Sequence, residues 1–424
     1  MRTVTYWLSL LVIFMIPWET LVVIPGFGSV SRFLGIFVGA FWLFTVLVTG
    51  KFRKIAPIHV FIFLFILWNA LSVLWSIDPD ETLTRLLTYV QMAVFSLIIW
   101  DLYSTPSAIR AGLQAYVLGL TVVIASTINN FLASSQTDYV LYGRYSASGS
   151  NANTTGILLA MGLPLAWYLA STAGDKKVER VLRLVNYAYI PMITFTMILT
   201  GTRFAIIMSL PAFIFGLGTL TRLKPGYRIL IFILLAMALF SLGSKIPQAS
   251  IQRLGTIDEE IQGGDLNDRT ELWRLGLDFW LEHPILGIGS AGFDPAVEPI
   301  YGRPRALHNS FIAIAAELGI VGIVLFAIIL VIAILQAWRH PTKWETWFWL
   351  TVLAAWCIGN LALTWVYSKP TWLLLSLLFA SASLVRQYSP FWPDAELRKG
   401  NETTIPQAPQ LQTSHNPLNQ LNHN

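Results

Sequence analysis

Long apolar segments alternate with short polar ones along almost the whole chain. A transmembrane helix needs about 20 mostly apolar residues, and twelve segments come near that length. They are residues 6–24, 32–49, 57–75, 86–103, 108–129, 153–172, 184–200, 204–220, 227–244, 308–337, 345–366 and 370–386. The pattern predicts an all-α, polytopic integral membrane protein with about 12 transmembrane helices.

The charges between these segments predict which loops face the cytoplasm. The short loops KFRK, GDKKVERVLR, TRLKPGYR and WRHPTKW are basic, whereas the loop SIDPDE is acidic. Lys and Arg are enriched in cytoplasmic loops of membrane proteins. If the N-terminus lies inside, all four basic loops also lie inside and the acidic loop lies outside. We therefore predict a multi-pass protein with both termini in the cytoplasm.

Two regions do not read as membrane spans. Residues 245–306 form one large outer loop, which is too long for a simple connector. Within it, NDRTELWRLGLDFWLEHP predicts an amphipathic helix that starts near Asn267 or Asp268 and ends before Pro284. The polar tail, residues 387–424, is rich in Asn, Gln and Pro and is predicted to be disordered.

Composition narrows the class further. The chain is 55% hydrophobic and only 12% charged, about half the charged fraction of a soluble domain. The net charge of +5 is explained by the basic loops and requires no nucleic-acid partner. The single cysteine, Cys357, excludes an internal disulfide and a cysteine metal cluster. His, Asp and Glu show no metal-ligand spacing, and the acidic run IDEEIQGGDLND reads as a solvated loop. We expect no cofactor.

The stretch HNSFIAIAAELGIVG combines unusual residues for a membrane helix. His308 stands at its outer boundary, and on a continuous helix Gly319 and Gly322 return to within about 40° of the His308 face. Small residues on that face would admit another helix or a lipid chain. Glu317 points the opposite way, and a structural, hydrogen-bonded role is favoured over a functional one.

Three arginines are predicted at the same depth as His308. Arg144 precedes the sixth span, Arg203 lies in the turn between the seventh and eighth, and Arg269 lies on the amphipathic helix. A guanidinium is suited to phosphate oxygens, and an imidazole is suited to proton abstraction. If the spans form one bundle, this set fits an anion with a lipid tail that is met at the outer leaflet.

These residues resemble a known family, the O-antigen ligase and O-antigen polymerase (Wzy-like) superfamily of bacterial membrane glycosyltransferases. The ligase pattern is His, then Asn, Ser or Gln, then nine residues, then Gly-x-x-Gly. It reads His308-Asn309 through Gly319-Ile320-Val321-Gly322 here. The segment RTELWRLGLDFWLEHPILGIGSAGF looks like the outer loop of the family. TGTRFA is similar to its Ser-Arg-Gly segment, with Thr202 and Phe204 in place of Ser and Gly.

The resemblance implies a function. Residues 1–386 would form a ligase-like transmembrane domain of the bacterial plasma (inner) membrane. It would transfer a glycan from an undecaprenyl pyrophosphate carrier to a hydroxyl of a glycan, a lipid such as the lipopolysaccharide core, or a protein. The enzyme would be an inverting glycosyltransferase that needs no metal. Polymerisation of O-antigen or exopolysaccharide is the alternative within the family. A transporter, for instance of inorganic carbon, is the alternative from another class, and a non-catalytic envelope scaffold ranks last.

The same resemblance suggests roles for single residues. His308 would be the general base, with Arg269 and Arg203 holding the pyrophosphate. Arg144 would be a further phosphate or glycan contact, and Asn309 would orient the imidazole or touch sugar. Trp273 offers a flat surface, for which a membrane-boundary role is favoured over sugar binding.

Overall fold

A computed structural model describes residues 1–24, 28–133, 143–174, 176–220, 225–243 and 269–388, together with residues 223, 250 and 255. The predicted tail lies outside the described residues from 389 onward. The predicted helix cap at Asn267 or Asp268 and the acidic run 257–268 lie outside them as well.

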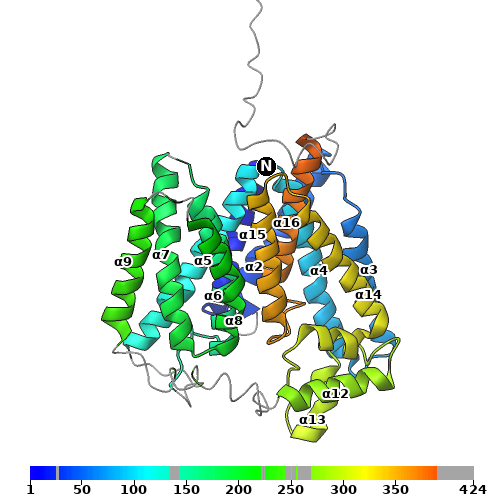
Figure 1. The fold of residues 1–424 in the computed structure, drawn as a ribbon. Helices are drawn as coiled ribbons and strands as arrows, with labels where there is room; N and C mark the ends of the chain where they lie inside the picture. The colour runs from blue at the N-terminus through cyan, green and yellow to red at the C-terminus, as the bar shows by residue number, and fades with distance from the viewer. Residues whose placement is uncertain are drawn as a thin grey trace, which may run out of the picture.

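Each of the twelve predicted spans corresponds to one helix (Figure 1). The helices are α1 (Arg2–Met15), α2 (Val30–Thr49), α3 (Ile58–Leu71), α4 (Pro79–Leu102), α5 (Pro106–Leu132), α6 (Ala152–Ser171), α7 (Lys177–Thr200), α8 (Arg203–Thr219), α9 (Pro225–Gly243), α14 (Ser310–Trp338), α15 (Lys343–Asn360) and α16 (Lys369–Tyr388). Among the described residues, α2, α4, α5, α6, α7 and α14 are long and apolar enough to cross a membrane. The prediction of an all-α polytopic membrane protein is confirmed.

The first span is shorter than predicted. α1 is followed by the 3-10 turn η1 (Ile16–Trp18), where Pro17 interrupts the α-helical pattern. A small hairpin of β1 (Val23–Ile24) and β2 (Gly28–Ser29) then leads to α2. Glu19, predicted to lie inside a span, follows the last helical turn and therefore lies at the end of the bundle.

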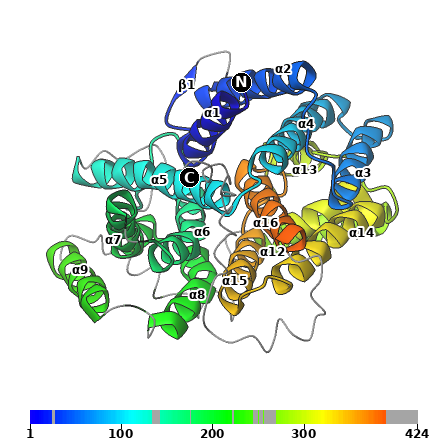
Figure 2. The ribbon, with the colours of Figure 1, turned by 90° about the horizontal axis from the view of Figure 1, so that it is seen from above.

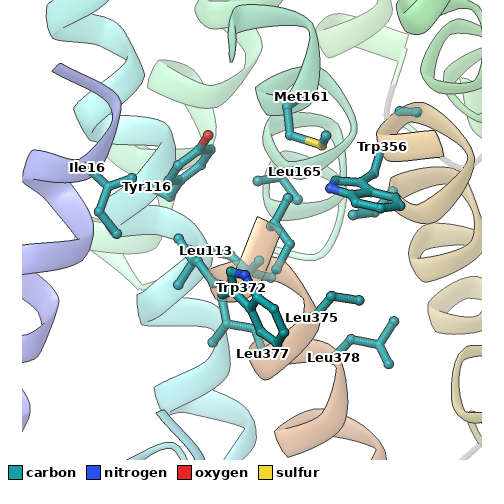
Figure 3. Packing of buried hydrophobic residues seen from close by; sticks show 14 of the residues in the cluster. Ile16, Leu113, Tyr116, Met161, Leu165, Trp356, Trp372, Leu375, Leu377 and Leu378 are labelled. Carbon is teal, nitrogen blue, oxygen red and sulfur yellow. The ribbon is translucent and has the colours of Figure 1, made fainter. Parts of the chain in front are cut away.

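The interior of the bundle is packed with large apolar side chains. α6 is deeply enclosed, with most of its residues buried inside the bundle. Figure 3 shows Met161 and Leu165 of α6 beside Tyr116 of α5, Trp356 of α15 and Trp372 of α16. Because helices distant in sequence share this core, loops at the ends of the bundle are held on a rigid base.

Two further helices, α12 (Arg269–Glu282) and α13 (Phe293–Tyr301), lie together at one end of the bundle (Figure 1). We call this end the loop end. They enclose a small apolar core of Leu272, Ile288, Phe293, Val297 and Leu307. The start of α1 and the end of α16 lie at the opposite end, where Arg53 donates to the Ser383 hydroxyl at 2.8 Å. The sequence analysis predicted that the first and the last span have their outer ends on the same side of the membrane, and this arrangement agrees with it. Which side faces the cytoplasm stays a prediction.

Candidate active site

His308 lies just before α14 in a strained backbone conformation. Its φ is 54°, in the left-handed region that side-chain-bearing residues seldom adopt. Such a conformation costs about 1–3 kcal/mol and persists only where surrounding contacts enforce it. Among the described residues, one other non-glycine residue has a positive φ, Ala291 in the loop before α13 (φ 63°). Backbone strain of this kind concentrates at functional sites, and His308 is the strained residue that carries a titratable side chain.

The residues that flank His308 hold it in place. Asn309 is the N-cap of α14, because its side-chain oxygen accepts the backbone N–H groups of Phe311 and Ile312 at 3.0 and 3.2 Å. The Ser310 hydroxyl lies 2.5 Å from Asn360 Oδ1 and accepts the N–H of Trp365 at 2.8 Å. The Asn309 oxygen therefore serves as a helix cap, and the prediction that it orients the imidazole or touches sugar stays untested.

Trp273 fixes the same segment from the other side. Its indole N–H donates to the carbonyl of Leu307 at 3.1 Å, and its ring packs on the small core of the loop end. Gly276, one turn later in α12, lets Leu307 and Ile312 approach. An added Cβ would lie 2.6 and 2.9 Å from their side chains. Trp273 therefore positions the backbone next to His308.

α14 is not the continuous helix that the small-residue face assumed. Gly319 has φ 63° and ψ −162°, a combination open in practice only to glycine. The backbone breaks there, so Gly319 and Gly322 do not continue the His308 face, and that prediction is wrong. An added Cβ at Gly319 would lie 2.2 Å from the carbonyl oxygen of Ile285. The glycine is required by the close approach of the loop before α13.

That loop occupies the break and satisfies the backbone groups that it frees. Three hydrogen bonds of 2.9 Å join this loop to α14: Ile288 N to Ala316 O, Gly289 N to Glu317 O, and Ile320 N to Pro284 O. A fourth, also of 2.9 Å, runs from Trp68 Nε1 of α3 to Leu318 O. Unpaired backbone groups at membrane depth are costly, so broken helices persist only where such partners exist. The loop 284–289 is thereby fastened into the bundle.

Glu317 completes this fastening. Its buried carboxylate accepts the backbone N–H groups of Ala291 and Phe293 and interacts with the charge of Arg85 on α4. Arg85 in turn lies over the ring of Tyr367, 3.6 Å from the centroid. The structural, hydrogen-bonded role predicted for Glu317 agrees with these contacts. The acid joins α4, α14 and the loop before α13.

The predicted arginines gather around the turn before α8. Arg144 donates to the Thr200 carbonyl at 2.7 Å and to the Thr202 hydroxyl at 3.2 Å, which brings it to the turn that carries Arg203. Arg203 is the first residue of α8, where the positive end of the helix dipole adds to its field. The guanidinium of Arg269 lies 5.7 Å from the ring centroid of the next residue, Phe204.

The electrostatics of His308 confirm that Arg269 is close to it. Burial lowers the pKa of the imidazole from 6.5 to about 4, with further lowering by the charges of Arg269 and then Arg305. The side chain is therefore neutral at neutral pH and able to accept a proton. Arg305 was not among the predicted site residues. It lies in RPRALHN, three residues before His308, a proximity the sequence itself displays.

His308 lines a cavity of about 390 Å³ at the loop end. Its walls also come from α4, the start of α6, and the segment 363–370 between α15 and α16. The polar residues of the lining that the sequence interpretation missed include Thr364, Tyr367 and Lys369. Lys369 pairs with Glu19. Among the described residues, the buried hydroxyl of Thr364 has no hydrogen-bond partner. Nothing in the local sequence marks these residues.

The donor groups of this region are suited to anions and hydroxyl groups. In the described ranges, no three His, Cys, Asp or Glu side chains come together as a metal site would require. The cavity lining holds the His308 imidazole, the Lys369 ammonium group and the Glu19 carboxylate. The charges of Arg269 and Arg305 act on the imidazole. This set can take up a proton and stabilise negative charge on a neighbouring oxygen.

Comparison with known proteins gives two matches. The sequence model of the family described as O-antigen ligase matches residues 188–327, a range that runs from α7 into α14 and includes Arg203, Arg269 and His308. The chain is also 25% identical over 333 residues to the exopolysaccharide production protein ExoQ of Rhizobium meliloti (strain 1021). That alignment covers 72% of each chain.

Proposed function

Since the chain belongs to the O-antigen ligase and polymerase (Wzy-like) superfamily of polysaccharide-biosynthesis membrane proteins, we propose that it transfers a glycan from undecaprenyl pyrophosphate to an acceptor hydroxyl. The transfer takes place at the loop end, which faces the periplasm in the predicted topology. The observation that carries this proposal is a neutral, strained His308 beside Arg269 at the rim of a cavity.

The proposed step is a direct displacement at the anomeric carbon. His308 takes the proton of the acceptor hydroxyl while its oxygen bonds to that carbon. The bond from the anomeric carbon to the pyrophosphate oxygen breaks, and the electron pair leaves with undecaprenyl pyrophosphate. Arg269 and Arg203 stabilise the charge that builds on the leaving group. Attack from the opposite face inverts the anomeric configuration, and a retained linkage in the product would contradict this scheme.

The arginines in this scheme do the work of a metal ion. A guanidinium holds two phosphate oxygens at once through parallel N–H groups, and burial strengthens that interaction. Arg144 is bonded to the turn before α8, so in this scheme it supports Arg203 and reaches the glycan side of the donor. Transfer is therefore expected to proceed without a divalent cation.

Two alternatives to a ligase are a polymerase and a transporter. A polymerase would use the same site with a growing glycan as acceptor, and the similarity to an exopolysaccharide production protein favours that acceptor class. A transporter would use the break in α14, since broken helices serve as ion sites. Against it, the freed backbone groups and the Glu317 carboxylate are bonded to the loop before α13.

The test is complementation of a strain from which the gene has been deleted. Wild type, His308→Ala and His283→Ala are expressed at matched levels, and surface and lipid-linked glycans are compared by gel and mass spectrometry. His283 is an exposed histidine of the same end and serves as control. His308→Ala alone should lose the mature product and accumulate lipid-linked glycan. Long stalled chains identify a ligase, and single repeats identify a polymerase. Full restoration by His308→Ala would exclude this mechanism.

A further inference from the structure

A second cavity, of about 410 Å³, is lined by α2, α4 and α1. Figure 2 shows these three helices as neighbours. The lining of the cavity is almost entirely apolar and includes Val38, Val94 and Phe95. On α2 the lining extends from Ser31 to Leu43, which at about 1.5 Å per residue is about 18 Å along the helix. The cavity thus runs through more than half of a hydrocarbon core about 30 Å thick.

Ile16 and Lys369 line both this cavity and the one that contains His308. Lys369 pairs with Glu19 and donates to the Ser31 hydroxyl at 3.1 Å. Arg32, next to Ser31, also lines the groove, so charged groups stand at the loop end of a mainly apolar lining. An amphipathic ligand would place its apolar tail on one side of Lys369 and its polar head on the other.

We propose that the groove between α2 and α4 binds the isoprenoid tail of the glycan donor, with Lys369 at the junction between tail and pyrophosphate. This inference rests on the proposed function, because only a lipid-linked donor has a tail to place. The residues shared with the His308 cavity, Ile16 and Lys369, favour the donor over an ordinary membrane lipid. A tail in this groove brings its own phosphate end to Lys369 and its first sugar toward the imidazole.

The groove can be filled without disturbing the site. Gly35 lies on α2 in the lining, with helical backbone and no atom within 4 Å of an added Cβ. Gly35→Leu should therefore fold and occupy the groove. Gly218→Leu is the matched control, because Gly218 is an exposed glycine of α8 that also has nothing within 4 Å and does not line the groove.

Purified wild-type protein and both variants are assayed with two donors that carry the same glycan, one on undecaprenyl and one on dimethylallyl pyrophosphate. The single isoprene unit of the second donor is too short to reach Gly35, which lies about 6 Å along α2 from Ser31. Gly35→Leu should raise KM for the undecaprenyl donor about tenfold, which corresponds to lost burial of about two methylene groups. Its kcat and its KM for the dimethylallyl donor should stay unchanged, as should all constants of Gly218→Leu.

The outcomes separate this inference from the proposed function. If the wild-type protein transfers the glycan from neither donor, the proposed function fails and this inference with it. If wild type is active and Gly35→Leu matches it with both donors, or loses both equally, the tail does not lie in the groove. A photoreactive phospholipid that labels α2 and α4 equally with and without saturating donor would also overturn the proposal.

Lys369 is tested by a double substitution. If it contacts the pyrophosphate, Lys369→Gln lowers kcat/KM for both donors, and Glu19→Gln/Lys369→Gln stays equally low. If Lys369 only neutralises Glu19, the double variant returns to wild-type rates, because both charges are then removed together. Recovery in the double variant would remove Lys369 from the donor site.

Discussion

The depressed pKa of His308 makes a quantitative prediction about pH. The imidazole pKa falls from 6.5 to about 4 through burial, Arg269 and Arg305. A general base works only in its neutral form, so kcat/KM should stay high as the pH falls below 6.5 and decline only near the lowered pKa. In the donor complex, pyrophosphate charge offsets both arginines. The decline in kcat should therefore occur at higher pH than the decline in kcat/KM.

The perturbation that isolates this effect is Arg305→Gln. Removing a positive charge favours the imidazolium, so the pKa of His308 rises and the acid decline of kcat/KM moves to higher pH. Arg305 is the last of the three causes in order of size, and all three lower the pKa. It therefore accounts for at most a third of the drop, which bounds the movement at about 0.8 pH unit, or about 1 kcal/mol.

The assay is the initial rate of glycan transfer against pH, with wild type, Arg305→Gln and Arg303→Gln side by side. Arg303 is an exposed arginine of the same segment and does not contribute to the pKa of His308. Its variant should reproduce the wild-type profile. A movement to lower pH, an equal movement in both variants, or an unchanged decline in the residual activity of His308→Ala would refute the assignment of this pKa to the catalytic base.

Further predictions concern the break, the cap and the arginines. Gly319→Ala should lower Tm and abolish transfer, because its Cβ meets the Ile285 carbonyl, whereas Gly302→Ala, with φ 67° and open space, should cost only about 1 kcal/mol. Thermal unfolding in detergent distinguishes the two. Asn309→Ala should lower the free energy of unfolding by about 1 kcal/mol through loss of the helix cap, and Asn309→Ser should retain most of it. Thermal unfolding measures both variants. Arg269→Lys should lower kcat/KM about 10–100-fold through loss of bidentate contact, measured by single-turnover transfer. Chelation by EDTA should leave the transfer rate unchanged, and a loss restored by Mg²⁺ would contradict the proposed role of the arginines.

Hydropathy predicted the helices well because each span must satisfy the same local requirement for about 20 apolar residues. The twelve predicted spans therefore match twelve helices. The predicted ends are wrong where Pro17 ends the first helix early and where Asn309 caps α14. His308 was predicted as the first residue of its span, yet Asn309 caps α14 and leaves His308 in the preceding loop. That loop position is what allows the strained backbone.

Long-range pairing could not be predicted in this way. The break at Gly319 depends on a loop about 30 residues earlier that bonds across it, and an apolar segment such as ELGIVG gives no local sign of a break. Lys369 and Glu19 are 350 residues apart, so their pairing follows only from the packing of α16 against the end of α1. The helix end before Pro284 was predicted, but the close approach that follows was not: an added Cβ at Gly287 would lie 2.4 Å from the Glu317 backbone.

Several contacts together hold the strained backbone of His308 in place. The left-handed backbone costs about 1–3 kcal/mol, and the Asn309 cap contributes about 1 kcal/mol. Each neutral hydrogen bond, such as that from Trp273 to Leu307, adds about another. No single contact outweighs the strain, so several must act together. The hydrogen bonds across the break in α14 hold the neighbouring loop in place beside them. Loss of one of these contacts should therefore displace the imidazole without unfolding the protein. We expect a large decrease in kcat and only a small decrease in Tm.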